Sequence, residues 1–166
     1  MNATVVSTRF DTRPWVSAGA AGLIAGLVFA MWAMAVGIFT TTLWAAPQGI
    51  AQSIGIGQAG HDFQPVPLIV GLMGHMMNCI VIGLVFFGIV EALRLRGGLL
   101  VIAGMVYGIV VYVVMYDLVL RGLLLGTSGS FLTANPEWSW VLGHLMYGLV
   151  LGVLLAFSPL RRRLQA

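Results

Sequence analysis

Charged residues are scarce in this sequence, and lysine is absent altogether. Among 166 residues, Lys and Arg together number eight, all of them Arg, and Asp and Glu number five. Charged residues make up 8% of the chain, whereas a soluble domain has about 25%. Such a chain cannot cover its own surface with polar groups, so lipid must solvate much of it. The small net charge of +3 does not indicate a nucleic-acid-binding protein.

Cysteine and the common catalytic motifs are also lacking. The single cysteine, Cys79, excludes a disulfide within one chain and is most simply a small buried apolar residue. The sequence has no phosphate-binding glycine loop in a suitable context, no nucleophile elbow and no H-E-x-x-H zinc motif. These absences favour a protein that is not an enzyme.

Long apolar stretches are what the chain has in abundance. Four of them are long enough to cross about 30 Å of hydrocarbon, which takes about 20 helical residues. They predict transmembrane helices at about 15–44, 65–93, 99–125 and 138–158, with Pro47 ending the first. We therefore expect an N-terminal arm at 1–14, an all-α transmembrane domain at 15–158 and a basic tail at 159–166.

The arginines predict the orientation of these helices. Seven of the eight fall on the side of the membrane that holds both termini: Arg9, Arg13, Arg94, Arg96, Arg161, Arg162 and Arg163. Cytoplasmic loops carry such an excess of positive charge. Both termini are therefore expected to be cytoplasmic, and the two polar loops are expected to face outward.

A repeated motif indicates an internal duplication. The pattern G-H-x-M-x-x-x-V-x-G occurs at 74–83 and again at 143–152. The shorter sequence I-A-G likewise occurs twice, at 24–26 and at 102–104. The two halves, about 15–94 and 97–158, read as tandem helical hairpins. We expect a pseudo-two-fold axis along the membrane normal to relate them.

The duplication places one histidine, His75 or His144, in each half at a similar expected depth in the membrane. One interpretation is structural: a neutral imidazole can bond a backbone carbonyl or a hydroxyl and lock the helices together. The other is that the two rings face each other as axial ligands of haem or another tetrapyrrole. Gly71 would then leave space for the macrocycle, and Asn78 and Tyr147 would share the histidine faces.

Two further kinds of site use the same region. His75, His144, Cys79 and Met146 offer ligands for copper or another soft metal. The histidines together with Asp117 are also compatible with a proton or small-solute pathway. Asp117 and Arg121 lie four residues apart, so we expect them to form a structural ion pair on one helix face.

Three short segments carry a resemblance to a known group. The stretches 43–51 (LWAAPQGIA), 74–78 (GHMMN) and 143–148 (GHLMYG) resemble a family of small, uncharacterised bacterial four-helix inner-membrane proteins. Asn78 stands where a smaller residue is usual in that pattern. The resemblance implies topology and a bacterial inner membrane, and it implies no activity.

These observations lead to a ranked expectation of function. The first is a non-enzymatic membrane protein that serves as a subunit or accessory factor of a larger complex, with a membrane-protein partner or another copy of itself. The second is a membrane-bound electron carrier that holds a tetrapyrrole between His75 and His144. The third is the proton or small-solute pathway.

Overall fold

The computed structural model describes residues 13–124 and 126–157, and every regular element in this part of the chain is a helix. The described residues form four long apolar helical spans: α1 (Arg13–Thr40), α3 (Pro65–Ala92), α4 (Leu99–Tyr112) continued by the π-helix η1 (Val113–Leu123), and α6 (Glu137–Phe157). Each span is long and apolar enough to cross a membrane. The expected all-helical fold with four such spans is therefore confirmed. Of the expected arm at 1–14, residues 1–12 lie outside the described residues, and Arg13 and Pro14 belong to α1. The expected tail at 159–166 also lies outside the described residues.

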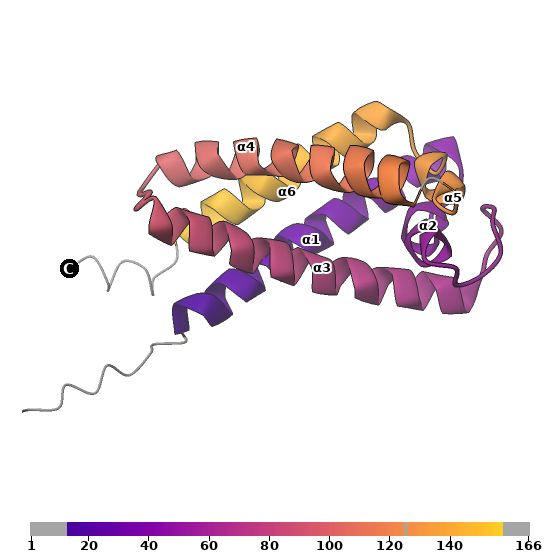
Figure 1. Cartoon of the computed structure of the whole chain (residues 1–166), viewed down its shortest axis with the longest axis horizontal. Coiled ribbons are helices and arrows are strands. Elements are labelled where there is room, and N and C mark those ends of the chain that lie inside the picture. The colour runs from indigo at the N-terminus through magenta and orange to yellow at the C-terminus, as the bar shows by residue number, and fades with distance from the viewer. Residues whose placement is uncertain (1–12, 125, 158–166) are drawn as a thin grey trace, which may run out of the picture.

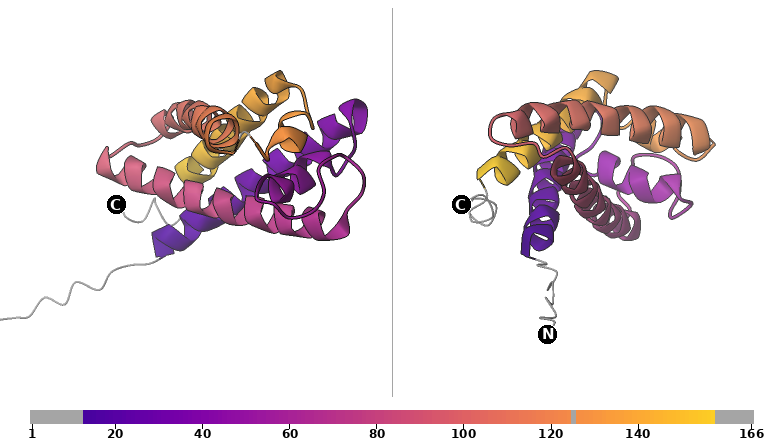
Figure 2. Two further views of the ribbon diagram at one scale, coloured as in Figure 1. Left: turned by 45° about the vertical axis from the view of Figure 1, so that its right-hand side comes forward. Right: turned by 60° about the vertical axis from the view of Figure 1, so that its left-hand side comes forward.

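The long helices form two hairpins, α1–α3 and α4–α6, which pack together through α1 and α6. Helix α1 runs obliquely across the bundle and packs along both α3 and α6, and α4 packs along α6 (Figures 1 and 2). By contrast, α3 and α4–η1 make few contacts, and the two diverge from the turn that joins them. One side of the bundle is therefore closed by helix packing, and the opposite side is splayed.

Close backbone contacts at glycines hold each hairpin together. Between α1 and α3, a Cβ added to Gly83 would lie 2.8 Å from the Cα of Gly22. Between α4 and α6, a Cβ added to Gly148 would collide with the carbonyl group of Gly104. Small residues allow such approach in lipid, where packing rather than the hydrophobic effect drives helix association.

The first span ends earlier than the sequence suggested. We expected a helix to Trp44, but α1 ends at Thr40, and a separate short helix α2 (Ala45–Ser53) follows. The chain turns back over Gly37, whose added Cβ would lie 2.5 Å from the Thr42 carbonyl oxygen. Pro47 therefore does not end a helix. It is the third residue of α2, where its missing N–H costs no helical hydrogen bond.

Helix α2 and the short helix α5 (Gly129–Leu132) cover one end of the bundle, which we call the capped end (Figure 1). Nearly all of α2 is buried, including the side chains of Gln48 and Gln52. Gln48 Nε2 donates to the Asp62 carbonyl at 2.7 Å, and Gln52 Nε2 donates to that of Gly60 at 3.2 Å. The long loop after α2 is thus folded onto α2.

The third span changes its helical register, which the sequence did not predict. The α-helical hydrogen bonds of α4 give way to the wider turns of η1, and the Leu124 N–H bonds the Val119 carbonyl at 2.8 Å. Tyr112 and Tyr116 stack at the change of register, with ring centroids 5.2 Å apart. Such π-helical segments occur frequently at functional sites.

Candidate functional site

A cavity of about 330 Å³ lies on the splayed side of the bundle. Residues from α3, α4 and η1 form its side walls, α1 and α6 form its back, and α2 and Phe131 of α5 border it at the capped end. Its volume falls within the range of about 300–1,000 Å³ that is typical of small-molecule sites. The sequence-predicted residues His75, Asn78, Cys79, His144 and Tyr147 all line it.

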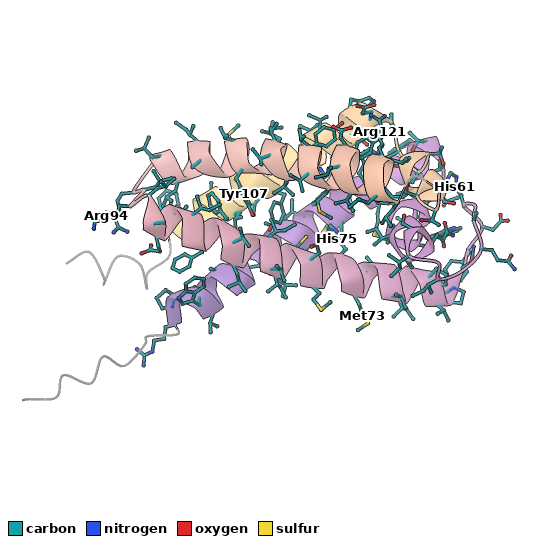
Figure 3. All side chains as sticks on the ribbon, viewed as in Figure 1. His61, Met73, His75, Arg94, Tyr107 and Arg121 are labelled. Carbon is teal, nitrogen blue, oxygen red and sulfur yellow. The ribbon has the colours of Figure 1, made fainter. Side chains whose placement is uncertain are left out.

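The cavity opens where α3 and η1 diverge. Asn78 lines it and is also exposed, and Leu72 and Met115, on opposite walls, are half-buried. At the other end Tyr107 bridges the walls, because its hydroxyl donates to the Ile82 carbonyl at 3.0 Å (Figure 3). The cavity is therefore open to the side, between the Tyr107 bridge and the capped end.

The side chain of His75 ties α3 to α1. Its Nε2 lies 3.0 Å from the Gly26 carbonyl oxygen, which can only accept, so Nε2 carries the proton. Nδ1 is then an acceptor, and its partner is the Cys79 thiol, a weak donor, at 4.0 Å. The bond to Gly26 matches the structural interpretation of a histidine that locks two helices, and it leaves Nδ1 only weakly engaged.

His144 bonds within its own helix instead. Its Nδ1 lies 2.7 Å from the Trp140 carbonyl oxygen, so Nδ1 carries the proton and Nε2 is a bare acceptor. Gly148 explains the difference between the histidines: where α3 has Cys79, α6 has Gly148 packed directly on the Gly104 carbonyl. The closer approach of α4 and α6 leaves no room for an imidazole between them.

The two imidazoles are not directly opposed, because Phe29 contacts both. Its ring meets His75 and His144 edge-on, with centroid separations of 5.4 Å and 4.6 Å. The space beside Gly71 is also filled, since an added Cβ there would collide with the Pro47 carbonyl of α2. Gly71 therefore makes room for α2 rather than for a macrocycle. The residues in this arrangement do not fit a bis-histidine tetrapyrrole.

The metal hypothesis gains little from the side-chain positions. His75 and Cys79 are adjacent, with Nε2 and Sγ 3.6 Å apart, but Phe29 intervenes before His144, and Met146 is not among the residues that line the cavity. Within residues 13–124 and 126–157, no group of three or more His, Cys, Asp or Glu side chains could hold a metal ion.

Asp117 and Arg121 belong to a charged cluster at the capped end. Arg121 pairs with Asp117 at 3.2 Å and with Glu137 of α6 at 3.0 Å, and its guanidinium lies 4.8 Å from the Tyr116 ring centroid. Glu137 also accepts a hydrogen bond from Tyr112 at 3.0 Å. This cluster ties η1 to the first turn of α6. None of its charged residues lines the cavity.

Sequence reasoning missed two residues of the cavity wall. Phe29 gave no signal beyond its place in an apolar run. Trp140 lies one helical turn before His144 and is 1% exposed, and its Nε1 has no hydrogen-bond partner within the described chain. A buried polar group without a partner is costly and calls for an explanation. The π-register that positions Tyr116 and Leu120 had no sequence signal.

Comparison with known proteins adds no relative. No protein-family model, no curated protein sequence and no solved structure matches the chain.

Proposed function

We propose that the protein is a non-enzymatic membrane protein that works by binding, as a subunit or accessory factor of a larger membrane complex. The observation that carries this proposal is the cavity on the splayed side, which holds a mid-span amide, Asn78, at its mouth. A polar side chain within a transmembrane segment is a candidate functional residue. The described residues give the Asn78 amide no hydrogen-bond partner, which favours an external one.

The origin of the cavity follows from the duplication, which we also propose. In the alignment of the repeats, Gly26 corresponds to Gly104 and Cys79 to Gly148. Gly26 packs against Cys79 in the first hairpin, and Gly104 packs against Gly148 in the second. The shared register of these contacts supports two copies of one hairpin. A two-fold axis would make the α1–α6 and α3–α4 contacts alike. Instead, α1 and α6 pack closely whereas α3 and α4 make few contacts, and the cavity lies on the α3–α4 side.

We further propose a bacterial inner membrane with both termini in the cytoplasm. The arginine-rich turn between α3 and α4, with Arg94 and Arg96, supports this orientation by the positive-inside rule. The capped end and the mouth of the cavity next to it would then lie toward the extracytoplasmic surface. Cysteine-accessibility labelling of the variants Gln58→Cys and Arg94→Cys tests the orientation. Labelling of position 94 alone from the periplasm would contradict it.

Native mass spectrometry from lipid nanodiscs tests whether the cavity binds a guest. Gly74 lines the cavity and has no neighbouring atom within 4 Å of an added Cβ, so Gly74→Phe adds bulk at the cavity wall without a backbone clash. Val85→Phe adds similar bulk on an exposed face of the same helix. We expect wild type and Val85→Phe to retain bound apolar molecules that Gly74→Phe loses. Equal retention by all three would contradict the proposal.

The place in a larger complex needs its own test. Mild solubilisation from native membranes should release the protein in a particle of discrete size that contains a defined second component or further copies of the chain. Asn78→Leu should weaken that particle if the amide contacts the partner, and Met77→Leu, on the neighbouring exposed position, should not. A protein that remains a monomer under the mildest conditions would contradict this role.

A further inference from the structure

The geometry points to a neutral, lipid-soluble alcohol as the ligand of this cavity: a long apolar tail that carries a hydroxyl head group. This inference rests on the binding function proposed above and specifies the chemistry of the guest.

The absence of charge in the cavity wall excludes charged head groups. No Asp, Glu, Lys or Arg is among the described residues that line it. The nearest charged cluster, around Arg121, is engaged with its own partners at the capped end. Burial of an unpaired charge in a low-dielectric site is costly. A phosphate, carboxylate or ammonium head group would therefore find no counter-charge here.

The unused hydrogen-bonding groups of the wall specify the head group. Nε2 of His144 is left as an acceptor once its Nδ1 has bonded the Trp140 carbonyl, and Nδ1 of His75 has only the weak Cys79 thiol donor at 4.0 Å. The Trp140 indole N–H also has no acceptor among the described residues, but it is buried away from the cavity space, so the head group is not assigned to it. A hydroxyl can donate to an imidazole nitrogen, whereas an ester carbonyl only accepts. A hydroxyl thus matches these acceptors.

The side opening specifies the tail. The wall is otherwise apolar, with residues such as Leu72 and Ile82 on α3 and Met115 and Val119 on the opposite wall. Asn78 stands exposed at the mouth, where its amide can both donate and accept. A tail that leaves between α3 and η1 stays in hydrocarbon, so the ligand need not leave the bilayer to bind.

Histidine NMR with matched probes tests this inference. The protein, ¹⁵N-labelled at histidine in nanodiscs, is titrated with decane, methyl decanoate, n-decanol and decanoate, which share a tail and differ in head group. We expect n-decanol to shift the unprotonated nitrogen of His75 or His144 saturably, and to bind about tenfold tighter than methyl decanoate, as one additional hydrogen bond implies. His61 serves as an internal reference, because its Nε2 bonds the Ser130 carbonyl in the cap.

The outcomes separate this inference from the function on which it rests. If decane, the ester and the alcohol bind equally well, and Gly74→Phe abolishes the binding of all three, the alcohol specificity is wrong and the binding function stands. Preference for decanoate would also overturn the specificity. If no probe gives a saturable shift that Gly74→Phe removes, both proposals fail. Asn78→Leu should reduce the preference for the alcohol over decane, with Met77→Leu as its control.

Discussion

The carbonyl oxygen of Gly26 on α1 accepts a hydrogen bond from Nε2 of His75 on α3 at 3.0 Å. The two helices are closely packed around this bond, since a Cβ on Gly26 would lie 2.6 Å from the Cβ of Cys79. A glycine on α1 therefore determines which nitrogen of the imidazole carries the proton, and leaves the other nitrogen free as an acceptor.

The first prediction is that the two cavity histidines are opposite tautomers. His75 should carry its proton on Nε2, because the Gly26 carbonyl accepts there, and His144 should carry it on Nδ1, because the Trp140 carbonyl accepts there. The ¹⁵N chemical shifts of the labelled imidazoles in bilayers report the tautomer directly. The same tautomer at both positions would show that one of these two contacts is absent.

The second prediction concerns the glycine contact between α4 and α6. Gly148→Ala places a methyl group against the Gly104 carbonyl, which cannot move without shifting a helix. We expect the free energy of unfolding in bicelles to fall by about 1–3 kcal/mol, as for other overpacked sites. Gly74→Ala is the control, because the space at its Cβ is open, and its effect should stay within about 0.5 kcal/mol. Similar effects at the two positions would argue against the close contact.

The third prediction concerns one of the hydrogen bonds between the hairpins. The buried hydroxyl of Tyr147 on α6 donates to the Cys79 carbonyl on α3 at 2.8 Å. Tyr147→Phe removes the donor and keeps the ring, so stability should fall by about 0.5–1.5 kcal/mol. Reversible unfolding in bicelles measures the change. A Tyr147→Phe protein as stable as wild type would mean that the hydroxyl has no such partner in the membrane.

The fourth prediction concerns the cap. Gln48 is fully buried and its Oε1 accepts from the Gln64 backbone N–H at 3.2 Å. Gln48→Ala should speed hydrogen exchange of the Gln64 amide about tenfold, the factor that corresponds to one lost hydrogen bond. Gln58→Ala replaces an exposed glutamine of the same loop and should leave this rate unchanged. If both variants exchange alike, α2 does not anchor the loop.

The helical spans were predictable from the sequence because apolar length is a local property. Gly22 and Gly26 are four residues apart, and such helical spacing of small residues is a sequence pattern that favours close helix contacts in lipid. The sequence did not predict α2, because Pro47 can either end a helix or lie in the first turn of one. The position of α2 depends on two close contacts with residues remote in sequence. The Pro47 carbonyl lies against Gly71, and Gly49 lies against Phe131.

The sequence predicted part of the residues that line the cavity but not their geometry, and two of the predicted residues, Gly71 and Met146, are not among those that line it. Repeat spacing predicted a common depth for His75 and His144, and helical spacing predicted that Asn78 and Tyr147 share the histidine faces. Which nitrogen each imidazole exposes depends on carbonyls of Gly26 and Trp140, which no residue pattern encodes. Phe29 keeps the rings from direct opposition through packing alone, so the expectation of two facing imidazoles did not anticipate it.

The central claim is that the cavity between α3 and η1 is open to the hydrocarbon of the bilayer. Paramagnetic broadening of the imidazole signals by a phospholipid with a nitroxide at mid-chain tests it most directly. In nanodiscs, the signals of His75 and His144 should broaden clearly more in wild type than in Gly74→Phe, with His61 as the reference in both. Equal broadening in the two proteins would show that hydrocarbon chains do not enter the cavity, and would contradict the account.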